Sequence, residues 1–136
     1  MLKKEEIIML GFWILMLGTV LLIPLLMLGF GKLFMKKPPQ KINHFFGYRT
    51  AMSMKNQDTW TFAHKYCGGL WFKWGWGILL ISVLPMVLVF KKDEDTVRFI
   101  AGIVCTLQII PLILAAILTE NALKKTFDKN GNRKNG

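Results

Sequence analysis

Acidic residues and cysteines are scarce in this chain of 136 residues. Asp and Glu number 8 against 18 Lys and Arg, which gives a formal charge of +10. The two cysteines, Cys67 and Cys105, form no CxxC motif and are too few for a disulfide framework. Charged residues make up only 19% of the chain and apolar residues 53%, which excludes an intrinsically disordered segment. The length suits a single domain.

Sequence motifs of catalysis are also missing. The chain has no Gly-rich phosphate-binding loop, no Ser-His-Asp set and no paired carboxylates. His64 and Cys67, spaced i and i+3 with His44 upstream, offer two metal ligands at most, and His64 is more simply explained as facing lipid headgroups. We therefore expect a protein without enzyme activity, cofactor or metal.

Three long runs without charge are present instead, over residues 7–31, 74–90 and 99–119. As helices, the first and third would rise about 38 and 31 Å, against about 30 Å for the hydrocarbon core of a bilayer. The middle run is long enough if its helix begins near Leu70, with Lys73 turned to the headgroups. A soluble helix of this length would carry a polar face, which these runs lack.

The sequence thus predicts an all-α membrane protein, with one domain over residues 1–136. We expect transmembrane helices over about 7–31, 70–90 and 98–119. The first run is too long for a signal peptide and no A-x-A site follows it, so we expect it to be retained.

Basic residues gather in the loop 32–69 and in the tail 120–136. With three spans these segments share one side, which collects 12 of the Lys and Arg residues against 5 on the other side. The positive-inside rule then predicts a cytoplasmic loop and C-terminus and an N-terminus outside. This topology and anionic headgroups explain the charge without a nucleic-acid partner.

Several residues inside the spans have expected packing roles. Gln108 is the most polar residue near the middle of a span, so we expect its amide to face another helix or a partner chain, and less readily a substrate. A proline in each span should kink its helix: Pro24, Pro85 and Pro111. Small residues that would allow close helix contact are Ser82, Gly102 and Thr106.

The end of the loop has a helical pattern. Asn56 or Asp58 is predicted to cap a helix that begins near Thr59. Apolar residues then recur at spacings of three and four: Trp60, Ala63, Cys67, Leu70 and Trp74. We expect an amphipathic interfacial helix over about 58–69 that bends at Gly68-Gly69 into the second span. An aromatic belt follows at the membrane entry: Trp71, Phe72, Trp74 and Trp76.

The middle of the loop carries candidate binding residues. Gly47 suits a tight turn, and the hydroxyl of Tyr48 can reach the interface while its ring packs. The planar guanidinium of Arg49 suits a carboxylate, a phosphate or backbone carbonyls. A ligand-binding role and a purely structural one, with Arg49 tied to Glu120 or to lipid phosphate, both fit these residues.

The loop sequence Asn43-x3-Gly47-Tyr48-Arg49-Thr50-x2-Ser53-Met54-Lys55-Asn56-x2-Thr59-Trp60-x2-Ala63 resembles the signature of the SdpI/YfhL family of small bacterial membrane proteins. The order of one hydrophobic helix, this loop and two more helices is also similar to the family's domain. The resemblance implies a protein of the bacterial cytoplasmic membrane that protects the cell against a secreted killing peptide. The founding member is also described as a receptor that recruits a repressor, but it has additional spans, and this chain resembles a short form.

We therefore expect a non-enzymatic membrane immunity or sensor protein. Its partners would be the lipid bilayer, a toxin peptide, a cytoplasmic repressor and a second copy of the chain. The residues carried over by the resemblance are Asn43, Gly47, Tyr48, Arg49, Thr50, Ser53, Lys55, Asn56, Thr59 and Trp60. The alternative is a small oligomeric transporter or channel-like protein, with a polar path from Ser82, Thr106 and Gln108.

Overall fold

The computed structural model describes residues 2–134, which form three long α-helices. These are α1 (Lys4–Lys36), α2 (Gln57–Leu88) and α3 (Glu94–Thr126). Each is long and apolar enough to cross a membrane, so the predicted all-α membrane fold is confirmed. At 1.5 Å per residue each helix rises about 50 Å, well beyond the hydrocarbon core of a bilayer. Each helix is therefore longer than is needed to cross the hydrocarbon core.

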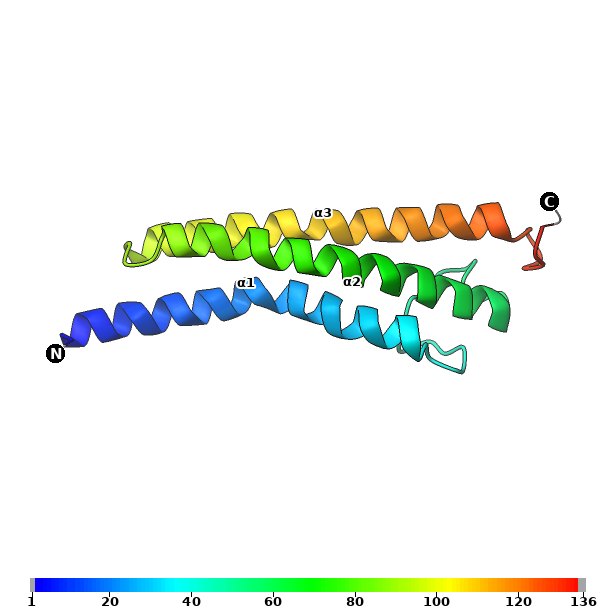
Figure 1. Ribbon diagram of the computed structural model, residues 1–136, viewed down its shortest axis with the longest axis horizontal. Coiled ribbons are helices and arrows are strands. Elements are labelled where there is room, and N and C mark those ends of the chain that lie inside the picture. The colour runs from blue at the N-terminus through cyan, green and yellow to red at the C-terminus, as the bar shows by residue number, and fades with distance from the viewer. Residues whose placement is uncertain (1, 135–136) are drawn as a thin grey trace.

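The helices run antiparallel to their chain neighbours as a slender bundle (Figure 1). The N-terminus and the short turn between α2 and α3 lie at one end, and the loop 37–56 and the C-terminal tail lie at the other. The two most basic segments thus share one end, as the count of three spans requires. We call this end, with the loop 37–56 and the tail 127–134, the loop end.

Large apolar side chains remain exposed along all three helices. Leu80 on α2 and Phe99 on α3 are each 67% exposed, for example. In water such a surface would favour association, whereas lipid chains cover it without cost. Together with the length of the helices, it identifies a multi-pass membrane protein.

Helices α1 and α2 approach each other closely at two glycines. A Cβ added at Gly31 would lie 2.8 Å from the carbonyl oxygen of Gly68, and one added at Gly68 would lie 2.7 Å from that of Gly31. The two backbones therefore touch, which only glycines allow. The predicted close contact is wrong within this chain for Gly102 and Thr106, which are exposed on α3.

A polar contact joins all three helices in the bundle interior. Pro24 has no N–H, so the carbonyl of Val20, one turn earlier in α1, loses its helical partner. The buried amide of Gln108 donates to that carbonyl at 2.8 Å and to the hydroxyl of Ser82 at 2.8 Å. Gln108 thus faces two other helices, as predicted, and restores the hydrogen bond that Pro24 removes. Figure 1 shows that α1 bends near its middle.

The segment 58–69 is not a separate helix. It forms the first turns of α2, which continues through Gly68-Gly69 along the same axis (Figure 1). The helix is therefore uninterrupted at the predicted bend, and Gly68 lies instead in the contact with α1. The packed face is also wider than the predicted stripe, because His64 is fully buried beside Trp60. That this part of α2 lies at the membrane interface stays a prediction.

Candidate functional site

The loop 37–56 crosses the loop end and is fastened to each helix. Tyr48 makes two of these connections. Its backbone N–H donates to Nε2 of His64 on α2 at 2.8 Å. Its hydroxyl donates to the carboxylate of Glu120 on α3 at 2.9 Å and lies 3.1 Å from the carbonyl oxygen of Ala116. The third connection is to α1, where the ring of Phe46 packs on Phe34 with centroids 5.6 Å apart.

Glu120, one of the partners considered for Arg49, is therefore bound by Tyr48 and not by Arg49. Burial, together with the hydrogen bond to Glu120, raises the pKa of Tyr48 far above its ordinary value. The phenol thus stays protonated and keeps its role as a hydrogen-bond donor over the whole physiological range.

Gly47 is required by its backbone and by its neighbour. Its φ of +109° is a region that other residues rarely adopt. A Cβ at this position would lie 2.3 Å from Nε2 of His64. The glycine thus lets the loop approach the ring closely enough for the N–H of Tyr48 to reach it.

Both ring nitrogens of His64 make hydrogen bonds within the chain. Its Nδ1 lies 2.8 Å from the carbonyl oxygen of Trp60, one turn earlier in α2, while Nε2 accepts from Tyr48. Both bonds can be made only by the neutral ring with its proton on Nδ1. The expectation that His64 faces the headgroups is wrong, because the ring is fully buried. Both ring nitrogens of His64 are thus engaged in hydrogen bonds, and residues 2–134 contain no group of three potential metal ligands.

Thr50 and Ser53 form a tight turn after Tyr48. The hydroxyl of Ser53 accepts from the backbone N–H of Thr50 at 2.8 Å, and the hydroxyl of Thr50 accepts from the N–H of Ser53 at 3.1 Å. The hydroxyl of Thr59 on α2 lies 3.0 Å from the carbonyl oxygen of the fully buried Ser53. These short-range bonds give the turn one conformation.

Asn56 caps α2, as predicted, and also binds the tail. Its Oδ1 accepts from the N–H of Thr59 at 2.9 Å, and its Nδ2 donates to the carbonyl of Gly131 at 2.7 Å. Two bonds of 2.8 Å join Arg133 to the carboxylate of Asp58. The tail 127–134 thus closes over the start of α2.

Two further signature residues hold the start of the loop. The side-chain oxygen of Asn43 accepts from the N–H groups of Phe45 and Phe46, which forms a turn. Trp60 is fully buried, and its indole donates to the carbonyl of Pro39 at 2.6 Å. Asn43 and Trp60 therefore act on the conformation of the loop.

Arg49 and Lys55 differ from the other signature residues because both are exposed. One N–H of the Arg49 guanidinium donates to the carbonyl of His44. Among residues 2–134, Arg49 makes no ion pair with a carboxylate. Arg49 is thus a positive charge whose remaining donors are free of acidic partners.

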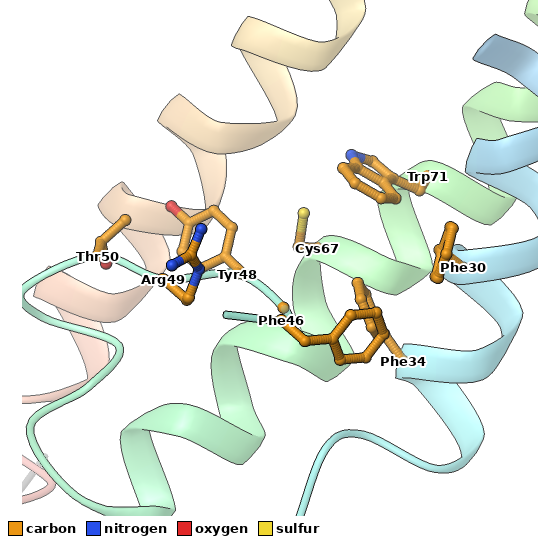
Figure 2. Close-up of a pocket in the computed structure, with 9 residues that line it drawn as sticks. Phe30, Phe34, Phe46, Tyr48, Arg49, Thr50, Cys67 and Trp71 are labelled. Atoms are coloured by element: carbon orange, nitrogen blue, oxygen red, sulfur yellow. The ribbon is translucent and has the colours of Figure 1, made fainter. Parts of the chain in front are cut away.

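A pocket of about 420 Å³ lies beside Arg49, between the loop and the first two helices (Figure 2). Aromatic rings form most of its wall, with Phe30 and Phe34 from α1 and Trp71 from α2. Phe46 closes it from the loop side. The remaining lining is formed by Gly47, Tyr48, Arg49, Thr50 and Cys67. The pocket is therefore apolar and aromatic with one cation, a chemistry that suits an amphiphile.

The amino-acid sequence matches one family of known proteins. The family model described as the SdpI/YfhL protein family matches residues 40–119. The chain belongs to this family. It is similar to the uncharacterized protein YfhL of Bacillus subtilis (strain 168), with 32% identity over 97 residues that cover 71% of this chain and 78% of the relative. No solved structure matches the chain.

The SdpI/YfhL match begins inside the loop and ends at Thr119 on α3. It includes every signature residue but neither α1 nor the tail. In this family member α1 nevertheless supplies Phe30 and Phe34 to the pocket and Gly31 to the contact with α2. The site is thus completed by an element outside the matched segment.

The polar path of the transporter alternative is not assembled within the chain. Gln108 and Ser82 bind each other in the interior. Thr106 is exposed on α3, where its hydroxyl donates to the carbonyl of Gly102. Within one chain the three residues therefore do not line one route, and a path formed between copies of the chain stays a prediction.

Sequence reasoning missed two contributors to the site. His64 was recognisable from its i, i+4 spacing to Trp60, which places it on the same helix face. The contact between Gly31 and Gly68 leaves no comparable signal, because glycines are frequent in transmembrane helices for several reasons.

Proposed function

We propose that this SdpI/YfhL family member protects a bacterial cell against a membrane-active toxin peptide. It would act in the cytoplasmic membrane, with the loop and the C-terminus in the cytoplasm and the N-terminus outside. The observation that carries the proposal is the family match, which spans the whole signature, the second helix and the third helix as far as Thr119. Family membership suggests an immunity-type membrane protein.

The loop supplies a physical route for sensing. Tyr48 joins α2, through His64, to α3, through Glu120. A peptide that inserts beside the helices and shifts one against another would strain these bonds and change the conformation of the loop. We infer that the loop reports the state of the bundle.

A cytoplasmic repressor would meet the exposed part of the loop. Phe45 is 93% exposed, and Arg49 is also exposed. Aromatic rings and guanidinium groups are both enriched in protein interfaces. The loop would therefore contact a partner through its exposed side chains, while Tyr48 contacts the helices.

Survival of a sensitive strain exposed to a purified killing peptide tests protection. We expect the wild-type chain to raise survival and Tyr48→Phe to reduce the gain, because this variant loses only the hydroxyl bonds to α3. Lys129→Ala, an exposed basic residue of the tail, is the control and should protect fully. Trp60→Ala would be uninformative, since the buried ring supports the fold itself.

No protection by the wild-type chain at a normal membrane level would contradict the proposal. Full protection by Tyr48→Phe would instead remove the loop from the mechanism. Uptake of a solute into liposomes, abolished by Gln108→Leu, would favour the transporter.

A further inference from the structure

We propose that the aromatic pocket beside Arg49 binds one anionic phospholipid from the surrounding leaflet. The phosphate would lie on the guanidinium of Arg49, and an acyl chain would lie against the rings of Phe30, Phe34 and Phe46. Figure 2 shows these rings on one side of the pocket and Arg49 on the other. This inference does not depend on toxin protection.

The charge distribution selects an anion. Twelve of the 18 basic residues of the chain belong to the loop end or to the helix ends that border it, against three acidic residues. Of these three, Asp58 is bound by Arg133 and Glu120 by Tyr48. Arg49 has no carboxylate partner within residues 2–134, so the charge at the pocket remains uncompensated. A phosphate supplies the bidentate acceptor that a guanidinium prefers.

The position of the pocket along the helices favours a lipid over a free anion as its ligand. Lys32 and Lys36 lie on the same turns of α1 as Phe34, and Lys73 lies two residues after Trp71 on α2. Lysines near the end of a membrane helix extend their ammonium groups to the headgroups. With these lysines at the headgroups, as the sequence predicts, the pocket would lie at the level of the lipid phosphates.

A hydrogen-bond donor without an acceptor in the pocket wall supports a ligand that carries oxygen atoms. The indole N–H of Trp71, a residue that lines the pocket, is buried and has no hydrogen-bond partner among residues 2–134. A buried donor without an acceptor is costly. An ester or phosphate oxygen of the lipid that reached this N–H would remove the cost.

Native mass spectrometry of the purified full-length chain, titrated with phosphatidylglycerol or phosphatidylethanolamine, tests the inference. We expect one phosphatidylglycerol per chain, held about tenfold more tightly than phosphatidylethanolamine. Arg49→Gln should lower this affinity about tenfold, because a charge-assisted bond is lost. Lys55→Gln removes the same charge from an exposed loop residue that does not line the pocket, and it should bind as the wild type does.

Phe46→Ala tests the apolar wall separately from the charge. It should weaken phosphatidylglycerol binding while leaving Arg49 in place. Far-ultraviolet circular dichroism establishes that each variant is folded, and the comparison of the two lipids on the wild-type chain needs no variant.

Four results would overturn the inference. The first is equal affinity for the two lipids, and the second is wild-type affinity in Arg49→Gln. The third is equally tight binding of glycerol phosphate, which would indicate a site for a free anion. The fourth is a killing peptide retained in place of lipid and lost in Arg49→Gln, which would indicate a peptide site.

Discussion

Replacement of Gly47 by alanine should break the contact between the loop and α2. The substitution adds one methyl group at a backbone φ of +109°. That methyl would lie 2.3 Å from Nε2 and 3.2 Å from Cε1 of His64. Because the ring is fully buried, it has no open space into which it can retreat.

The cost has three parts. The backbone strain of a residue with a side chain in this region is about 1–3 kcal/mol. Forcing a methyl group into a packed site costs about 1–3 kcal/mol. Separation of the ring from the N–H of Tyr48 loses about 1 kcal/mol more. We therefore expect Gly47→Ala to lower the free energy of unfolding by about 3–7 kcal/mol.

A double-mutant cycle with His64→Ala separates these parts. In the His64→Ala background the ring is gone, so Gly47→Ala should cost only the backbone strain. The double variant should then be more stable than the sum of the single effects predicts, by about 2–4 kcal/mol.

Unfolding in mixed micelles with increasing sodium dodecyl sulfate, followed by far-ultraviolet circular dichroism, gives these free energies. Gly29→Ala is the matched control, because a Cβ there meets nothing within 4 Å. It should leave the free energy of unfolding unchanged or raise it by up to about 1 kcal/mol. A cost below about 1 kcal/mol for Gly47→Ala, or simple additivity in the cycle, would refute the reasoning.

Three further predictions follow from other parts of the bundle. Gln108→Leu should lower the free energy of unfolding by about 0.5–1.5 kcal/mol, and this cost should be smaller in the Pro24→Ala background, because the restored N–H of residue 24 then binds the carbonyl of Val20. An equal cost in the two backgrounds, measured by unfolding in mixed micelles, would contradict this role of Gln108. A cysteine placed at Lys55 should react with an impermeant thiol reagent only in permeabilised cells, and one at Glu94 should react in intact cells; the reverse pattern would invert the topology. Hydrogen bonds from Thr96 lower the pKa of Asp93, so the ionised carboxylate should stabilise α3 at pH values above the pKa that Asp93 has in the unfolded chain. Asp93→Ala should therefore be less stable than the wild type at neutral pH and equally stable in acid, and a stability difference that persists in acid would contradict this explanation.

The sequence by itself determined the three membrane helices and the start of the second. Long uncharged runs without a polar face favour insertion into lipid, and this preference acts on each segment independently of the others. The cap at Asn56 is likewise local, because it joins residues three positions apart. The contact of Gln108 with another helix also followed from one residue, since an amide in lipid needs a partner.

The tertiary structure alone decided what the signature residues do. Whether Tyr48 or Arg49 binds Glu120 depends on the direction in which the loop crosses the bundle, and these residues are about seventy positions apart. The same holds for Gly131, whose contact with Asn56 spans 75 positions. The pattern of a segment encodes its own preference for helix or turn. It does not encode which distant surface completes its hydrogen bonds, because that choice is made by the packing of all three helices together.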